Sequence, residues 1–255
     1  MPIIRTPSAE DELDRQHTLL ASLGLERAEL ELELATLRAE LAQFDRLCRF
    51  RLAERYAQLD ELRALLAEVR ARKTPQRPAA RMEAEQARAK ARQSASEIPH
   101  EGEPEPPRTR FSPSDDLKAL YRKVVRLVHP DLACSETDAR RRHELMVAAN
   151  EAYAAGNEDR LREILTGASE LAPVPPSADI DAALTEALGS IEDVRKRIAT
   201  IQRELADLRR SDLCAFMLRA REAEEEGRDL LAEVAADLDL EIEEARRSLR
   251  EEEAG

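Results

Sequence analysis

The sequence predicts an all-α protein in which two long coiled-coil helices flank a short helical hairpin with a small third helix. This prediction rests on two observations, the amino-acid composition and the positions of the prolines. Charged residues make up 36% of the 255 residues, aromatic residues only 3%, and Trp is absent. Chains of this kind, rich in Ala, Glu, Leu and Arg and poor in Gly, usually form long helices rather than a large globular core. No segment alternates apolar and polar residues as a strand does, and the breaks in the helical patterns fall at proline clusters.

Charge and cysteine placement exclude several classes of protein. The formal net charge of −13 argues against binding to nucleic acid or to an anionic membrane surface. Cys48, Cys134 and Cys214 are far apart in the sequence and form no CxxC pair, so we expect no metal, no other cofactor and no disulfide framework. No apolar run approaches the roughly 18 residues of a membrane span. The N-terminus lacks the basic-then-apolar order of a signal peptide. We therefore expect a cytoplasmic protein that does not contact a membrane.

The first arm, residues 9–73, has the apolar spacing of a coiled coil. Its apolar residues alternate steps of four and three at Leu30, Leu34, Leu37, Leu41, Phe44 and Cys48. Residues 74–110 then form a polar, Pro-rich linker. It begins with "KTPQRPAARM" and includes the Ala-rich stretch "EAEQARAKARQSASE", which has no apolar stripe and so nothing to bury. "IPHEGEPEPPRTR" completes it as an extended segment.

The second arm, residues 178–250, follows a Pro-rich linker at 167–177. It repeats the four-three alternation at Ile180, Leu184, Ala187, Ile191, Val194, Ile198, Ile201, Leu205 and Leu208. The two arms are alike, because "ATLRAELAQF" at Ala35 aligns with "ATIQRELADL" at Ala199 and "LLAEV" occurs in both. Duplication and convergence both explain this likeness. A long helix leaves its apolar stripe wet when alone, so the arms should pair within one chain or across a homodimer.

Residues 111–166 are organised as a hairpin of two helices and a short third one. Ser112 or Ser114 caps the first helix, with Asp115 and Asp116 in its first turn. Apolar residues lie on one face of this helix and basic residues on the other: Leu117, Leu120, Tyr121, Val124 and Val128 against Lys118, Arg122, Lys123 and Arg126.

Proline and glycine set the ends of the hairpin's helices. Pro130 ends the first helix at His129. The second helix buries Leu145, Ala149, Ala152 and Tyr153 and stops at Gly156, after which Asn157 caps the third.

His129-Pro130-Asp131 is the candidate site, and its residue types permit either catalysis or docking. A general base needs a substrate pocket that excludes water, which an exposed loop tip does not offer. We therefore interpret the tripeptide as a recognition element, with His129 exposed and tolerant of substitution by Gln. The basic residues Lys118, Arg122, Lys123 and Arg126 then form an electrostatic dock for an acidic patch. Tyr121 and Tyr153 are expected in the core, and the "ARRRHE" segment around His143 is expected to be solvated.

Residues 111–166 resemble the J domain of DnaJ-type co-chaperones. "LYRKVVRLVHPDLA" followed by "ELMVAANEAYAAGN" places His-Pro-Asp after a Tyr-Arg-Lys helix and Asn-Glu-Ala-Tyr in the next helix, over about 55 residues. J domains also begin with a short aromatic-rich helix, and nothing like it precedes Leu117. Either Phe111 supplies part of that packing or the Ala-rich stretch folds back.

The resemblance implies a co-chaperone of the miscellaneous class of J proteins. His129, Pro130 and Asp131, with Lys118, Arg122, Lys123 and Arg126, would bind a DnaK-type chaperone and stimulate its ATP hydrolysis. The protein itself would be no enzyme, and the arms would select a client protein or a location. The alternative is a structural or scaffolding coiled-coil protein with an inactive J-like hairpin.

Overall fold

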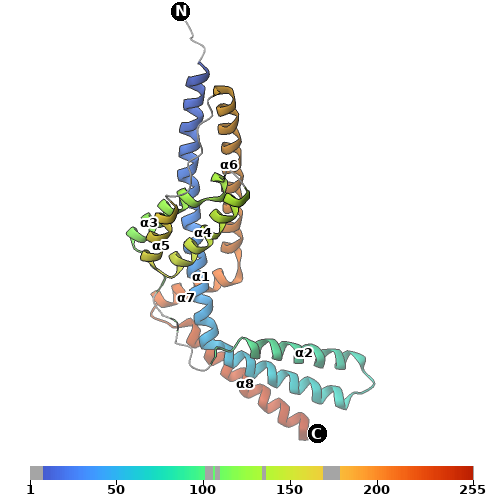
Figure 1. Cartoon of the computed structure of the whole chain (residues 1–255). Coiled ribbons are helices and arrows are strands. Elements are labelled where there is room, and N and C mark those ends of the chain that lie inside the picture. The colour runs from blue at the N-terminus through green and yellow to red at the C-terminus, as the bar shows by residue number, and fades with distance from the viewer. Residues whose placement is uncertain (1–7, 101–105, 107–109, 134–135, 169–178, 255) are drawn as a thin grey trace, which may run out of the picture. The chain divides into compact units, whose positions relative to one another are not determined.

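The computed structural model describes residues 8–100, 106, 110–133, 136–168 and 179–254, and over these residues it is all-α, without a strand. The predicted fold class is confirmed at this level. Figure 1 shows the helices, which are α1 (Ala9–Lys73), α2 (Pro78–Ser96), α3 (Asp115–Val128), the 3₁₀ helix η1 (Pro130–Leu132), α4 (Glu136–Ala154), α5 (Glu158–Ala168), α6 (Ile180–Arg210), α7 (Asp212–Glu225) and α8 (Leu230–Ala254). None of them is long and apolar enough to cross a membrane.

The breaks at 74–77, after Val128 and at Gly156 coincide with predicted proline and turn positions. The turn at 74–77 separates α1 from α2, and η1 follows His129. Gly156 has φ +66°, and the Asn157 side chain accepts a hydrogen bond of 2.9 Å from the Arg160 amide, as expected for a stop followed by a cap. Residues 169–177 of the second predicted linker and much of the "IPHEGEPEPPRTR" segment lie outside the described residues.

The chain forms two compact units, each built from segments distant in sequence. One combines residues 1–40 with 111–210, and the other combines residues 41–110 with 211–255. Helix α1 therefore contributes its first part to one unit and the remainder to the other.

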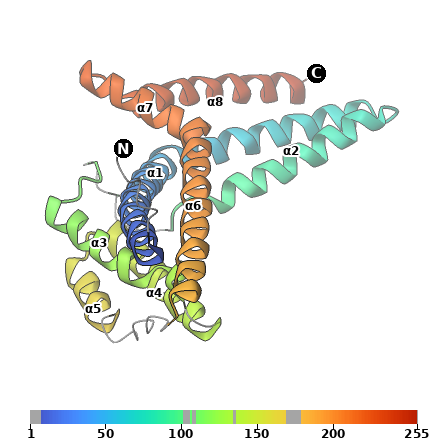
Figure 2. The same cartoon turned by 90° about the horizontal axis from the view of Figure 1, so that it is seen from above.

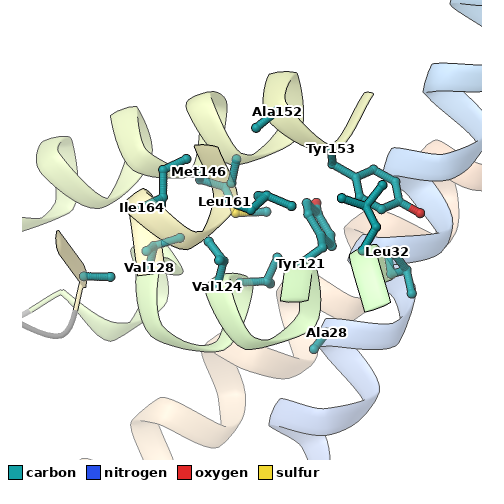
Figure 3. Close-up of a cluster of buried hydrophobic side chains, with 14 residues drawn as sticks. Ala28, Leu32, Tyr121, Val124, Val128, Met146, Ala152, Tyr153, Leu161 and Ile164 are labelled. Carbon is teal, nitrogen blue, oxygen red and sulfur yellow. The ribbon is translucent and has the colours of Figure 1, made fainter. Parts of the chain in front are cut away.

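In the first unit, α3, α4 and α5 form a three-helix group whose core is completed by α1. Figure 3 shows Leu32 of α1 beside Tyr121 and Tyr153, and Ala28 of the same helix below Tyr121. Phe111 contacts this cluster too, with its ring 5.6 Å from that of Tyr153. The additional packing on this three-helix group thus comes from α1 and Phe111. The Ala-rich stretch does not supply it, because that stretch forms α2 in the other unit.

Helix α6 packs on α1 in the first unit through part of the predicted seam. Leu34 of α1 and Ile201 and Leu205 of α6 are buried together. Arg38 donates a hydrogen bond of 2.6 Å to Glu204 beside them. The first stretch of the second arm therefore buries its apolar residues against the first arm of the same chain.

In the second unit, α8 runs alongside α1 in the same direction. The buried cluster contains Leu52, Leu59, Leu231, Leu238 and Ile242. Arg51 pairs with Asp229 at 2.8 Å and Arg63 with Glu241 at 2.7 Å. The later residue of α1 thus pairs with the later residue of α8, as expected for two helices that run in the same direction. Figures 1 and 2 both show the pair. The "LLAEV" segments at Leu65 and Leu230 do not lie opposite each other in this register.

The second arm is not one long helix, which corrects the prediction. Ser211 ends α6 and caps α7, because its hydroxyl accepts a hydrogen bond from the Cys214 amide at 3.2 Å. Gly227 then adopts φ +77°, a conformation that favours glycine, and the Arg228 amide bonds to the Ala223 carbonyl at 2.8 Å. Residues 212–225 thus form a separate helix, α7, with a stop at each end.

The Ala-rich stretch also differs from expectation, because it does bury residues. Helix α2 packs on α1 through Ala84 and Ala91, which are 8% and 3% exposed. Asp60 of α1, 4% exposed, accepts a hydrogen bond of 2.6 Å from Ser94 and pairs with Lys90 at 3.0 Å. A stripe of small residues is enough here, because alanines let two helices approach closely while polar contacts fix their register.

The seam between α1 and α6 should be sensitive to truncation. Ile201→Ala removes a side chain that is 0% exposed, so it should lower the free energy of unfolding by about 2–5 kcal/mol. Leu188→Ala, on the same helix at 48% exposure, should change it by no more than about 0.5 kcal/mol. Urea denaturation followed by circular dichroism measures both. Equal effects would mean that the seam does not stabilise the protein.

Candidate functional site

The candidate site begins with α3, whose ends follow from sequence. Ser114 is the cap, and its hydroxyl accepts a hydrogen bond of 3.0 Å from the Leu117 amide. At the other end, His129 precedes a proline and takes the extended conformation, with φ −59° and ψ 132°. The Leu132 amide then donates to the His129 carbonyl at 3.0 Å, which closes the short turn of η1.

The two tyrosines of the motifs are structural, as predicted. Tyr121 is 0% exposed and donates a hydrogen bond of 2.6 Å to the Asn150 side chain across the hairpin. Its ring lies 4.6 Å from that of Tyr153, whose hydroxyl is 2.8 Å from the Thr36 hydroxyl of α1. Burial raises the pKa of both tyrosines, so both remain neutral. The Tyr-Arg-Lys and Asn-Glu-Ala-Tyr motifs are thereby joined by direct contacts.

Arg142 is a residue whose role the sequence did not reveal. It was expected to be solvated with the rest of "ARRRHE", but it is only 4% exposed, whereas His143 is exposed. Its Nη1 donates to the Leu127 carbonyl at 2.6 Å and its Nε donates to Asp138 at 2.8 Å. It therefore satisfies a carbonyl in the last turn of α3, which the helix itself leaves without a partner.

His129 is buried, which corrects the expectation of an exposed loop tip. Its side chain is 3% exposed, and its Nε2 lies 3.4 Å from Glu31 Oε1 of α1. The physical reason is tertiary: α1 supplies Glu31 at the end of α3, and α6 packs against η1. The side chain of Asp131 lies outside the described part of the structure, and Pro130 is half-buried.

Glu31 is a buried carboxylate held by two cationic or polar partners. Arg197 of α6 reaches Oε1 with Nε at 2.8 Å and with Nη2 at 2.7 Å, while His129 approaches the same oxygen. Burial alone would raise the pKa of Glu31, but the hydrogen bond from His129 and the charge of Arg197 hold it below the ordinary value. Neither Glu31 nor Arg197 stands out in the sequence, because both read as polar positions of coiled-coil arms.

The predicted basic face is divided between paired and exposed residues. Arg122 forms an ion pair with Glu29 of α1 at 2.6 Å, and Lys118 forms one with Asp115 at 3.2 Å. Lys123 and Arg126 are exposed. The structure therefore brings His129 and Arg122 against carboxylates of α1 and leaves Lys123 and Arg126 facing solvent.

The exposed part of the hairpin combines charge with apolar surface. Leu127 at the end of α3 is 43% exposed and Leu132 of η1 is 40% exposed, close in sequence to Lys123 and Arg126. Such a surface can attract an acidic partner and then exclude water from the contact. In the described part of the chain, no His, Cys, Asp and Glu side chains are grouped to hold a metal ion.

Comparisons of the chain with protein-family models, with curated proteins and with solved structures found no match. The J-domain resemblance consequently depends on the two motifs and on the contacts between their residues.

Stability should depend on pH through Glu31. Because its pKa in the folded protein is below the ordinary 4.5, its stabilising contribution is complete above that value and is lost as the pH falls through the lower folded value. At pH 7, Glu31→Gln should lower the free energy of unfolding by about 1–3 kcal/mol. The gap between wild type and variant should narrow below pH ~4.5 in parallel urea titrations. A gap that is constant from pH 7 to 4 would contradict the assignment.

His129→Gln should also destabilise the fold, because the imidazole is buried against Glu31. We expect a loss of about 1–3 kcal/mol and a lower melting temperature. His143→Gln, at an exposed position of α4, is the matched control and should shift stability by about 0.5 kcal/mol at most. Thermal melts of the two variants decide the matter, and equal melting temperatures would restore the original expectation of a solvent-facing His129.

Proposed function

We propose that the protein is a co-chaperone that docks on a DnaK-type chaperone and stimulates its ATP hydrolysis. The observation that carries the proposal is the hydrogen bond between Tyr121 and Asn150, because it joins the helix leading to His-Pro-Asp with the helix of Asn-Glu-Ala-Tyr. The two motifs are thus parts of one small folded hairpin rather than chance matches in separate places.

In this proposal the hairpin acts by binding, and the chemistry takes place in the partner. Lys123 and Arg126 attract an acidic patch of the chaperone, and the loop at His129-Pro130-Asp131 completes the contact. The protein is no enzyme and needs no cofactor. The arms select a client protein or a location, within one chain or as a homodimer, and the setting is the cytoplasm, away from nucleic acid and membrane.

A structural or scaffolding role with an inactive hairpin is the second candidate. The specific observation that favours it is the burial of His129 against Glu31, since a covered recognition residue cannot contact a partner. In this case the J-like hairpin would serve only to brace α1 and α6.

Single-turnover ATP hydrolysis by a DnaK-type chaperone separates the two candidates. The full chain should accelerate hydrolysis, and Lys123→Ala with Arg126→Ala should weaken the effect more steeply as salt rises, because exposed charges act through a screened field. The charge-matched control is Arg160→Ala with Arg162→Ala on α5, whose surface ion pairs contribute little to stability.

The scaffold candidate predicts a different outcome. Neither the wild-type protein nor either double variant would then change the rate of hydrolysis, although all three remain folded by circular dichroism. Equal losses in the two double variants would mean that the basic residues of α3 have no special part.

A further inference from the structure

The carboxylates of α1 occupy two of the groups that docking would use. Glu29 pairs with Arg122 at 2.6 Å, and Glu31 lies 3.4 Å from His129. An acidic patch on a partner would need to approach these same side chains. Helix α1 therefore presents to the hairpin the kind of charge that an external partner must bring.

Helix α6 holds this arrangement in place. Arg197 binds Glu31 with two nitrogens, at 2.7 and 2.8 Å, and α6 also packs against η1. Of the three residues, Glu31 and His129 are nearly inaccessible, whereas the Arg197 side chain is 29% exposed. The contact is thus sealed on the hairpin side and reachable from solvent on the α6 side.

We propose that Glu29, Glu31 and Arg197 form an autoinhibitory cover over the docking loop. The cover and the chaperone compete for the same face of the hairpin, and docking requires α6 to withdraw from α1 and η1. This inference rests on the proposed function, whose site it regulates. It also reconciles the J-like motifs with a buried His129, because the structure then represents the closed state of a two-state element.

The packing of α6 makes such an opening feasible. The cluster shared by α1 and α6 has three fully buried residues, Leu34, Ile201 and Leu205, with Leu30, Leu37 and Leu208 partly buried beside them. Four further apolar residues of α6 are buried and would also have to be uncovered, namely Ala187, Ile191, Val194 and Ile198. The pair of Arg38 with Glu204 beside it is partly exposed, and pairs of that kind contribute little. Loss of Arg197 leaves the Glu31 carboxylate buried without its cationic partner, which is costly and favours a state in which water reaches it.

The test uses the full chain and two measurements on each variant. Arg197→Glu places a second carboxylate against Glu31 and should open the cover. Arg195→Glu is the matched control, because it makes the same charge change at an exposed position of the same helix. Ile201→Glu opens the seam by a separate route, and Leu238→Glu makes the equivalent change in the seam of the other unit.

The first measurement is the rate at which diethyl pyrocarbonate modifies His129, with the exposed His143 as internal reference in the same mass spectrum. The second is single-turnover ATP hydrolysis by the chaperone. In both opening variants, reactivity of His129 and stimulation should rise about tenfold, within the usual range of coupling between sites. Neither control should change either quantity. Glu29→Gln with Glu31→Gln replaces any opening variant that fails to fold.

The outcomes separate the inference from the proposed function. In one outcome, the wild-type protein stimulates hydrolysis and the opening variants make His129 reactive but stimulate no more strongly than the wild type. This outcome overturns the cover and leaves the proposed co-chaperone function intact. No stimulation by any variant, although His129 is reactive, overturns the proposed function and makes the contact purely structural. A His129 that is as reactive as His143 in the wild type, or unreactive in every variant, also overturns the cover.

Discussion

The first unit depends on the contacts that the buried Glu31 carboxylate makes with His129 and Arg197. This carboxylate lies between a helix that ends at a proline and a second arm that begins far away in the sequence, and it contacts His129 on one side and Arg197 on the other. An isolated charge in such a place would be strongly unfavourable. The pair with Arg197 and the contact with His129 compensate for burial, and they fix how α1, α3 and α6 meet. These polar contacts thus determine which helices meet, in addition to the packing of a small apolar core.

The hairpin needs α1 because a group of three short helices has too little core of its own. Domains of this size bury a smaller fraction of their surface than larger domains do, so each covering helix matters. Ala28 and Leu32 pack in the same core as Tyr121, and the ring of Phe111 contacts that of Tyr153. This same covering helix carries Glu29 to Arg122 and Glu31 to His129. The stability of the hairpin and the proposed cover over its loop therefore depend on one helix.

Local patterns predicted much of the fold. The cap at Ser114, the stop at Gly156 and the end of α3 before Pro130 depend on neighbouring residues, so they could be read directly. The core positions of Tyr121 and Tyr153 followed from the helical period. The candidate site was less predictable. Whether a loop is exposed depends on what packs against it, and nothing near the loop in sequence indicates that α1 and α6 do so.

The remaining errors have the same origin. Arg142 sits in a run of basic residues typical of a solvated surface, and only the position of the Leu127 carbonyl explains its burial. The Ala-rich stretch was expected to bury nothing, because an apolar stripe is usually recognised by its large side chains. In the structure the alanines of α2 let it approach α1 closely, and the hydrogen bond of Asp60 with Ser94 helps to hold the two helices together. The second arm was expected as one helix because of its four-three alternation of apolar residues. Turns at Ser211 and Gly227 instead divide it into three helices.

The sequence by itself determined the helical class, the ends of α1 and α3 and the motifs that resemble a J domain, because these follow from interactions within a few residues. Tertiary structure alone decided which helix covers the hairpin, that the second arm pairs with the first in separate stretches, and that His129 is buried beside Glu31. These depend on contacts between residues about 100 or more positions apart. A helical sequence shows which face is apolar, but it does not name the partner that covers that face, since many apolar faces are chemically alike.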